Sequence, residues 1–283
     1  MYAGAAIAVD LFGHATPAGV AWLRCLGAAV VLLAWRRPGR AAWRGRGLRL
    51  AIAFGVVTAG MNVLFYEAIA RLPLGTVVAM EFIGPVLVAA AGSRSVRDVL
   101  AVVLVACGVV AIADVQVSGS VLGVLFALGA AAAWAGYIVL GKRVASSSSL
   151  SSSGSSGSSV SSVSSGLDSL AIGFAAATVL LSPLAFGTGE VWSSPRMLLL
   201  GVGVGVLSTV VPYALDQVVL RRLGQARFAV LLALLPVTAG VMGFVLLGQV
   251  PSVPEAVGTL AVVAGVALRS REESVGPAPE PPG

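Results

Sequence analysis

Residues 71–94 decide the fold, because a related stretch follows later in the chain. The first stretch is RLPLGTVVAMEFIGPVLVAAAGSR, and the second, at residues 222–245, is RLGQARFAVLLALLPVTAGVMGFV. Each of five positions recurs 151 residues further on: Arg71, Leu72, Pro85, Val86 and Gly92 match Arg222, Leu223, Pro236, Val237 and Gly243. Both stretches have about the length, roughly 20 residues, that crosses a bilayer as a helix. The pattern predicts two copies of a membrane-spanning unit.

The composition supports a membrane protein. Hydrophobic residues make up 58% of the 283 residues, charged residues 11%, and the mean hydropathy is +0.98. A soluble domain carries about 25% charged residues, so this chain has too few polar groups for a soluble surface. The net charge of +6 would suggest nucleic acid in a soluble protein. Here the basic residues lie beside apolar runs, which predicts a lipid bilayer as partner and no nucleic acid.

Ten apolar spans are predicted. They cover residues 1–13, 17–35, 49–70, 74–92, 98–114, 119–141, 167–186, 196–219, 226–247 and 254–268. The first span rises only about 20 Å against a hydrocarbon core of about 30 Å, so we expect the sequence to begin inside the first helix. The predicted fold class is an all-α polytopic membrane protein of ten transmembrane helices.

The basic residues predict the orientation. Fifteen Lys and Arg residues follow even-numbered spans, whereas only Arg71 and Arg196 lie on the opposite side and Arg24 lies within a span. Loops rich in Lys and Arg remain in the cytoplasm. We therefore expect a multi-pass protein of the inner membrane with both termini in the cytoplasm.

The repeat predicts two inverted halves. Residues 1–115 and 119–269 each hold five spans, and an odd number inserts the second copy upside down relative to the first. Inverted repeats are typical of transporters that bind substrate near the bilayer midplane. A Ser-rich stretch, residues 145–166, is expected to be a flexible linker. The Pro-rich end, residues 270–283, is expected to be a disordered cytoplasmic tail.

Several stretches resemble a known family. The segments 8–24, 60–89, 132–143 and 207–223 are similar to EamA-type drug/metabolite transporters, and especially to bacterial threonine/homoserine exporters. EFIGP (81–85) and STVVPYALDQ (208–217) are the most specific parts. The resemblance implies ten helices in two repeats and export of small metabolites, driven by an ion gradient. One departure is that relatives often carry Glu before the second-repeat proline, where this chain has Leu235 before Pro236.

Polar residues at helical spacing are candidates for a substrate cavity. Asn62 and Tyr66 lie one turn apart, and Tyr213 and Gln217 are their counterparts 151 residues later. Polar groups in spanning helices usually face the interior of the bundle. These four side chains either line a central cavity or hydrogen-bond neighbouring helices as structural contacts.

Two of the charged residues within predicted spans are candidates for binding. Glu81 precedes Pro85 by one turn, and a proline kinks a helix and frees a backbone carbonyl. The Glu81 carboxylate could bind an amine or a proton, and Arg24 could hold a substrate carboxylate through a two-pronged hydrogen bond. The alternatives are a structural ion pair between them, or an Arg24 side chain that extends to the membrane surface. Pro85, Pro212 and Pro236 are predicted sites of helix kinking or gating.

These features favour a secondary transporter of a small-molecule substrate, with a proton as the expected coupling ion and no cofactor. A passive channel or a lipid scramblase is the alternative. An intramembrane enzyme would need a nucleophile with a base, or metal ligands. The only histidine, His14, lies in a predicted loop, so neither an enzyme nor a metal site is expected. The oligomeric state stays open, and a homodimer is possible.

Overall fold

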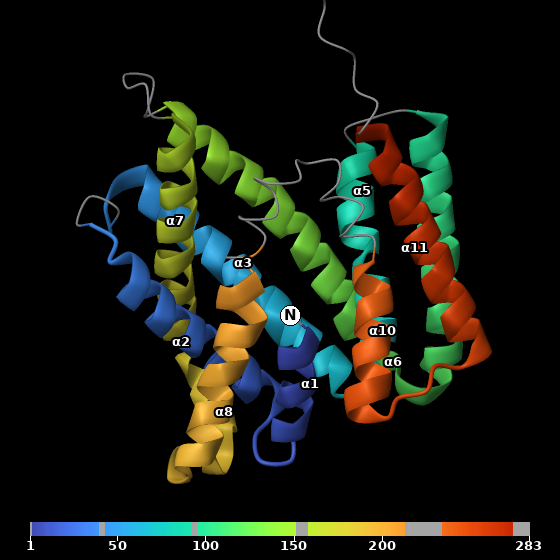
Figure 1. Cartoon of the computed structure of the whole chain (residues 1–283), viewed down its shortest axis with the longest axis horizontal. Helices are drawn as coiled ribbons and strands as arrows, with labels where there is room; N and C mark the ends of the chain where they lie inside the picture. Colours follow the sequence, from blue (N-terminus) through green and yellow to red (C-terminus); the bar gives the residue numbers. More distant parts are fainter. Residues whose placement is uncertain are drawn as a thin grey trace, which may run out of the picture.

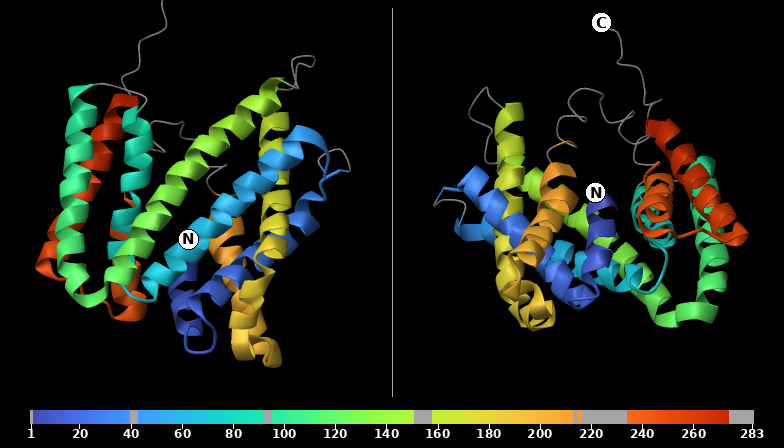
Figure 2. Two further views of the ribbon diagram at one scale, coloured as in Figure 1. Left: turned by 180° about the vertical axis from the view of Figure 1, so that it is seen from behind. Right: turned by 60° about the horizontal axis from the view of Figure 1, so that its bottom comes forward.

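The computed structural model describes residues 2–39, 43–91, 95–150, 158–212, 215 and 234–273. Within these ranges the chain is helical and contains no β-strand (Figure 1). One group of helices, α2, α3, α7 and α8, faces a second group, α5, α10 and α11 (Figure 1). Helix α1 and the later part of α6 lie between the two groups (Figures 1 and 2).

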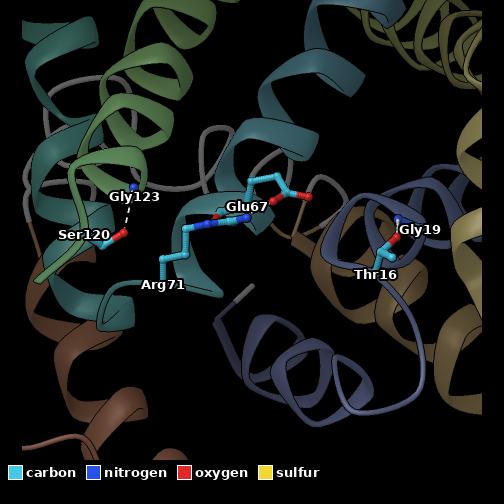
Figure 3. Close-up of polar contacts among 6 residues, drawn as sticks. All are labelled: Thr16, Gly19, Glu67, Arg71, Ser120 and Gly123. Carbon is cyan, nitrogen blue, oxygen red and sulfur yellow. Dashed lines mark hydrogen bonds and ion pairs between the residues drawn. The ribbon is translucent and has the colours of Figure 1, made fainter.

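The first three helices end at residues suited to helix termini. Helix α1 covers Tyr2–Leu11, α2 covers Pro17–Arg36 and α3 covers Gly45–Ile69. Thr16 caps α2, since its hydroxyl accepts a hydrogen bond from the Gly19 N–H at 3.1 Å (Figure 3). At the end of α3, Arg71 pairs with Glu67 at 2.6 Å (Figure 3). These local contacts lie at the start of α2 and at the end of α3.

The predicted span 74–92 forms a helix that is interrupted at a single residue, Phe82, whose backbone is still helical. Helix α4 covers Leu74–Glu81, and α5 covers Ile83–Ala91. Pro85 has no N–H to donate to the carbonyl of Glu81, four residues earlier, and its ring crowds that carbonyl. The helix is therefore interrupted beside Glu81.

Helix α6 covers Val96–Leu150 and contains two predicted spans. Its backbone leaves the helical region at Ser120, with φ −158° and ψ 90°. The Ser120 hydroxyl accepts a hydrogen bond from the Gly123 N–H at 3.1 Å and so caps a new helix (Figure 3). The two arms of α6 consequently run in different directions (Figure 2).

The later helices include two unusual segments. Helix α7 covers Ser158–Leu180, the 3₁₀-helix η2 covers Ser182–Ser193, and α8 covers Pro195–Gly205. The π-helix η3 covers Val206–Val210, and helices α10 (Leu235–Leu247) and α11 (Val253–Glu273) complete the described chain.

The predicted span 167–186 differs from the structure. The chain bends by 69° between residues 168–180 and 182–189. Pro183 supplies the physical reason, because proline disfavours the helical conformation in the residue before it and removes a backbone donor.

Four described helices are long and apolar enough to cross a membrane. They are Pro17–Arg36, Gly47–Ile69, Val96–Ala113 and Ser120–Leu140, and the bent pair 168–180 and 182–189 makes a fifth if counted as one span. Shorter apolar helices cover Tyr2–Leu11, Leu74–Val88, Pro195–Val210, Leu235–Leu247 and Val253–Leu268. The chain is thus a polytopic membrane protein that is all-helical over its described residues.

The Ser-rich segment is partly helical. Helix α6 continues to Leu150 and α7 begins at Ser158, whereas residues 151–157 lie outside the described ranges. Extending an existing helix needs no new nucleus, so serine residues beside an apolar helix can continue it. Of the C-terminal tail, residues 270–273 belong to α11 and the remainder is not described.

Glycine pairs allow the helices to cross closely. A Cβ atom at Gly55 on α3 would collide with the backbone of Gly173 on α7. A Cβ atom at Gly205 on α8 would lie 2.7 Å from the carbonyl oxygen of Arg24 and 3.1 Å from the Cα of Gly27, both on α2. Small residues at helix contacts are the usual means of close packing in membranes.

We predict that Gly55→Ala destabilises the protein, whereas Gly60→Ala does not. Overpacking of a tight contact costs about 1–3 kcal/mol. Gly60 lies on the same helix, and a Cβ there would meet no heavy atom within 4 Å. The apparent melting temperature in detergent, followed by fluorescence-detected size exclusion, should fall for Gly55→Ala alone. An equal response of the two variants would contradict the close crossing of α3 and α7.

Candidate functional site

Arg24 lies buried in the centre of the bundle. Only 4% of its surface is exposed. Its Nε donates to the Thr209 hydroxyl at 3.0 Å, and its Nη2 donates to the Ser208 carbonyl oxygen at 3.0 Å. The guanidinium carbon also lies 5.6 Å from the centre of the Tyr66 ring, within the range of a cation–π interaction. The side chain therefore points into the protein and does not extend to the membrane surface.

The predicted pair on α3 lies beside Arg24. Asn62 is 2% exposed and Tyr66 is completely buried. Among the described residues, neither the Asn62 Nδ2 atom nor the Tyr66 hydroxyl has a hydrogen-bond partner. Asn62 also lies close enough to the thiol of Cys25 to interact with it. Both roles, lining of a cavity and contact with neighbouring helices, remain predictions for this pair.

Glu81 is the second buried charged residue near Arg24. It ends α4, where the helix is interrupted, and it is 7% exposed. Arg24 lies close enough to interact electrostatically with Glu81, as does the phenol of Tyr2 on α1. Within the described chain, however, Glu81 accepts no hydrogen bond and forms no ion pair with Arg24 within 4.0 Å. The two opposite charges are neighbours without being direct partners.

Two functional candidates were missed by sequence reasoning. Ser208 and Thr209 lie on the π-helix η3, are buried, and both contact Arg24. Short π-helical segments occur frequently at functional sites. The sequence feature that could have indicated them is a pair of adjacent hydroxyl residues within an apolar span that also contains Pro212.

The remaining predicted residues are placed only in part. Tyr213 and Gln217 lie outside the described residues. Pro212 follows η3 and is half-buried. Pro236 lies buried in the first turn of α10, where a proline fits without kinking the helix. Pro236 also lines an apolar cavity of about 260 Å³ between α4, α10 and α11, away from Arg24.

A second buried polar cluster surrounds Glu255, at the start of α11. Its carboxylate accepts hydrogen bonds from the Thr76 hydroxyl at 2.8 Å and from Gln116 Nε2 at 2.6 Å. The Ser252 N–H and hydroxyl also donate to it, at 2.8 and 2.7 Å. This carboxylate is fully engaged in joining three helices, which suits a structural contact better than a ligand site.

The central site combines chemistry suited to a small charged molecule. It offers a guanidinium, a carboxylate and several unpaired polar groups, and these come from α2, α3, α4 and η3. No group of three metal-binding side chains occurs among the described residues. Buried ionisable groups within membrane helices typically mark a substrate or ion pathway. The fold and this site define a helical membrane protein of the transporter class.

The chain belongs to the EamA-like transporter family, whose model matches residues 121–271. It is 32% identical over 278 residues to the threonine/homoserine exporter RhtA of Escherichia coli K12, covering 96% of this chain and 88% of that protein. The RhtA protein of Salmonella typhimurium LT2 is 32% identical over 250 residues, with 87% and 79% covered. The family confirms the resemblance inferred from the sequence.

A solved crystal structure has a similar fold. It is superimposed with a TM-score of 0.59 and 19% sequence identity, covering 96% of this chain and 94% of the other. At that identity the likeness concerns the fold alone. Because the superposition covers nearly the whole of both chains, the helical arrangement is shared over nearly their full length.

Proposed function

We propose that this protein is a secondary transporter of the inner membrane that exports small amino acids such as threonine and homoserine. It works by alternating access, and a proton gradient supplies the energy. The observation that carries the proposal is the buried pair of opposite charges, Arg24 and Glu81, which are neighbours but not bonded to each other. A zwitterionic ligand offers one group of the matching charge to each.

The chemistry of the pair supports an amino acid. Arginine binds a carboxylate through two parallel hydrogen bonds, and a carboxylate binds an ammonium group through a charge-assisted one. Unpaired charges in a low-dielectric interior are costly, so a ligand that pairs both gains affinity there. The names of the RhtA relatives, which export threonine and homoserine, favour the same class of substrate.

Helix contacts support the proposed ten-helix arrangement of two inverted repeats, residues 1–115 and 119–269. Helix α3 packs against the second arm of α6, as α1 packs against α8. Likewise α3 crosses α7 as α8 crosses α2, in each case at glycine pairs. If the first repeat ends with the fifth predicted span, then α1, α2 and α3 correspond to the second arm of α6, to α7 and to α8. Each of these contacts is then repeated between the corresponding helices. The family match at residues 121–271 also covers nearly the whole proposed second repeat.

The proposed orientation has the termini and the Arg-rich loop after α2 in the cytoplasm, by the distribution of basic residues. A cysteine introduced at Arg37 should react with membrane-permeant reagents only. Labelling of that cysteine from the periplasm would reverse the assignment.

Transport by purified protein in proteoliposomes tests the function. Vesicles loaded with unlabelled threonine should take up labelled threonine by counterflow. Net accumulation should require an imposed pH difference and collapse when a protonophore is added. Accumulation that follows only the concentration gradient of the amino acid would instead identify a passive channel. Movement of labelled phospholipid between leaflets, without transport of amino acids, would identify a scramblase.

A further inference from the structure

Arg24 joins helices from the two proposed repeats. Its Nε–H and Nη2–H groups both point from α2 to η3, where they meet the Thr209 hydroxyl and the Ser208 carbonyl oxygen, each at 3.0 Å. These two hydrogen bonds form the Arg24 clasp. Two oxygen acceptors side by side are also what a carboxylate presents to a guanidinium. The acceptors on η3 therefore occupy Arg24 in the way that a carboxylate ligand would.

Three further polar atoms near the clasp form no hydrogen bond with any residue that the structure describes. They are the Tyr66 hydroxyl, Asn62 Nδ2 and the Ser208 hydroxyl, and all three are buried. The Ser208 hydroxyl and Arg24 lie close enough to the Tyr66 hydroxyl to interact with it. A buried polar group without a partner costs about 1–3 kcal/mol, so such a group indicates a ligand or another conformation in which it is bonded.

The chemistry of these atoms indicates an anion. An amide NH₂, two hydroxyls and a guanidinium all donate hydrogen bonds, and a carboxylate can accept about four. Helix α1 covers this side of the site, since a Cβ atom at Gly4 would collide with the Ser208 hydroxyl. The donors thus come from α2, α3 and η3, and α1 packs against them at Ser208.

We propose that the substrate carboxylate replaces the two acceptors of the Arg24 clasp. The carboxylate takes the hydrogen bonds of Arg24 and is held in addition by the Tyr66, Asn62 and Ser208 donors. This inference rests on the proposed function and adds a mechanism to it. Since the clasp joins the two proposed repeats, substrate binding releases η3 from α2 and allows α8 and η3 to move. Without substrate, the clasp holds the repeats together.

The proposal predicts opposite effects at adjacent residues. Thr209→Val keeps the shape of the side chain but removes one acceptor that competes with the substrate, so threonine should bind about 5-fold more tightly. Ser208→Ala removes a donor to the carboxylate, so binding should weaken about 10-fold, because hydrogen bonds to charged groups are the stronger kind. Equilibrium binding of labelled threonine to purified protein measures both effects.

The matched control is Thr58→Val on α3. Thr58 is buried like Thr209, but among the described residues its hydroxyl bonds to the Phe54 carbonyl of its own helix alone, at 2.7 Å. Threonine binding should be unchanged in this variant. Weaker binding by Thr209→Val, or tighter binding by Ser208→Ala, would overturn the proposal.

A measurement without substrate tests the Arg24 clasp independently of the proposed function. Cys25 is buried beside Arg24, and the exposed Cys107 can be replaced by serine. With the clasp weakened in Thr209→Val, a small thiol reagent should label Cys25 several-fold faster, whereas Thr58→Val should match the parent protein. If the parent protein binds none of the amino acids tested, the proposed function fails, and the labelling still decides the clasp. An unchanged rate in Thr209→Val would then refute it.

Discussion

Replacement of Arg24 by alanine should lower threonine transport at least 100-fold. The variant removes the only described guanidinium in the central site and leaves the substrate carboxylate without a counter-charge. Removal of one partner from a buried charge pair costs about 3–5 kcal/mol, which corresponds to a loss of roughly 100- to 4,000-fold. Initial rates of counterflow in proteoliposomes measure the effect.

Two variants complete this experiment. Arg24→Lys keeps the charge but loses the planar fork, so its rate should lie between those of the parent and Arg24→Ala. Arg36→Ala is the matched control on the same helix. Arg36 is partly exposed and pairs with Asp168 at 3.0 Å, and such pairs contribute little. If Arg24→Ala elutes as a folded protein and transports threonine normally, Arg24 does not bind the substrate.

Glu81→Gln should uncouple transport from the proton gradient. Glutamine has the shape of glutamate but neither carries a charge nor exchanges a proton near neutral pH. Accumulation driven by a pH difference should therefore fall more than 10-fold. Exchange of labelled for unlabelled threonine should be less affected, because exchange needs no net movement of protons. The affinity for threonine should also weaken, since the ammonium group loses its counter-charge.

The matched control for Glu81 is Glu67→Gln, on the adjacent α3. Glu67 pairs with Arg71 one turn later, and the two side chains are 15% and 31% exposed. Pairs of this i, i+4 kind on a helix contribute only about 0.2–0.5 kcal/mol, so both stability and transport should remain. Unchanged gradient-driven accumulation by a folded Glu81→Gln protein would exclude Glu81 from the coupling step.

Much of the membrane architecture could be predicted from local patterns. The hydropathy of α2, α3 and the two arms of α6 is a property of consecutive residues, so their existence follows from composition alone. The same reasoning selected Arg24, Asn62, Tyr66 and Glu81, because polar groups in apolar helices are costly and turn inward. All four are buried in the structure. Their proposed roles in binding remain predictions.

Other features depended on neighbours that are distant in the chain. The importance of Ser208 and Thr209 became visible only when Arg24 was seen to reach η3, some 184 and 185 residues away. The contact of Glu255 with Thr76 and Gln116 likewise joins residues 179 and 139 positions apart. The bend after Leu180 was missed because the apolar composition continues through it.

The amino-acid order alone specified that the chain enters the membrane as helices, since the free energy of burying apolar residues in lipid adds up locally along each segment. It also specified which side chains avoid lipid. The three-dimensional packing decided which of those side chains meet, because that depends on the rotation and crossing of helices at close glycine contacts. Packing therefore decided that Arg24 bonds to η3 and not to Glu81.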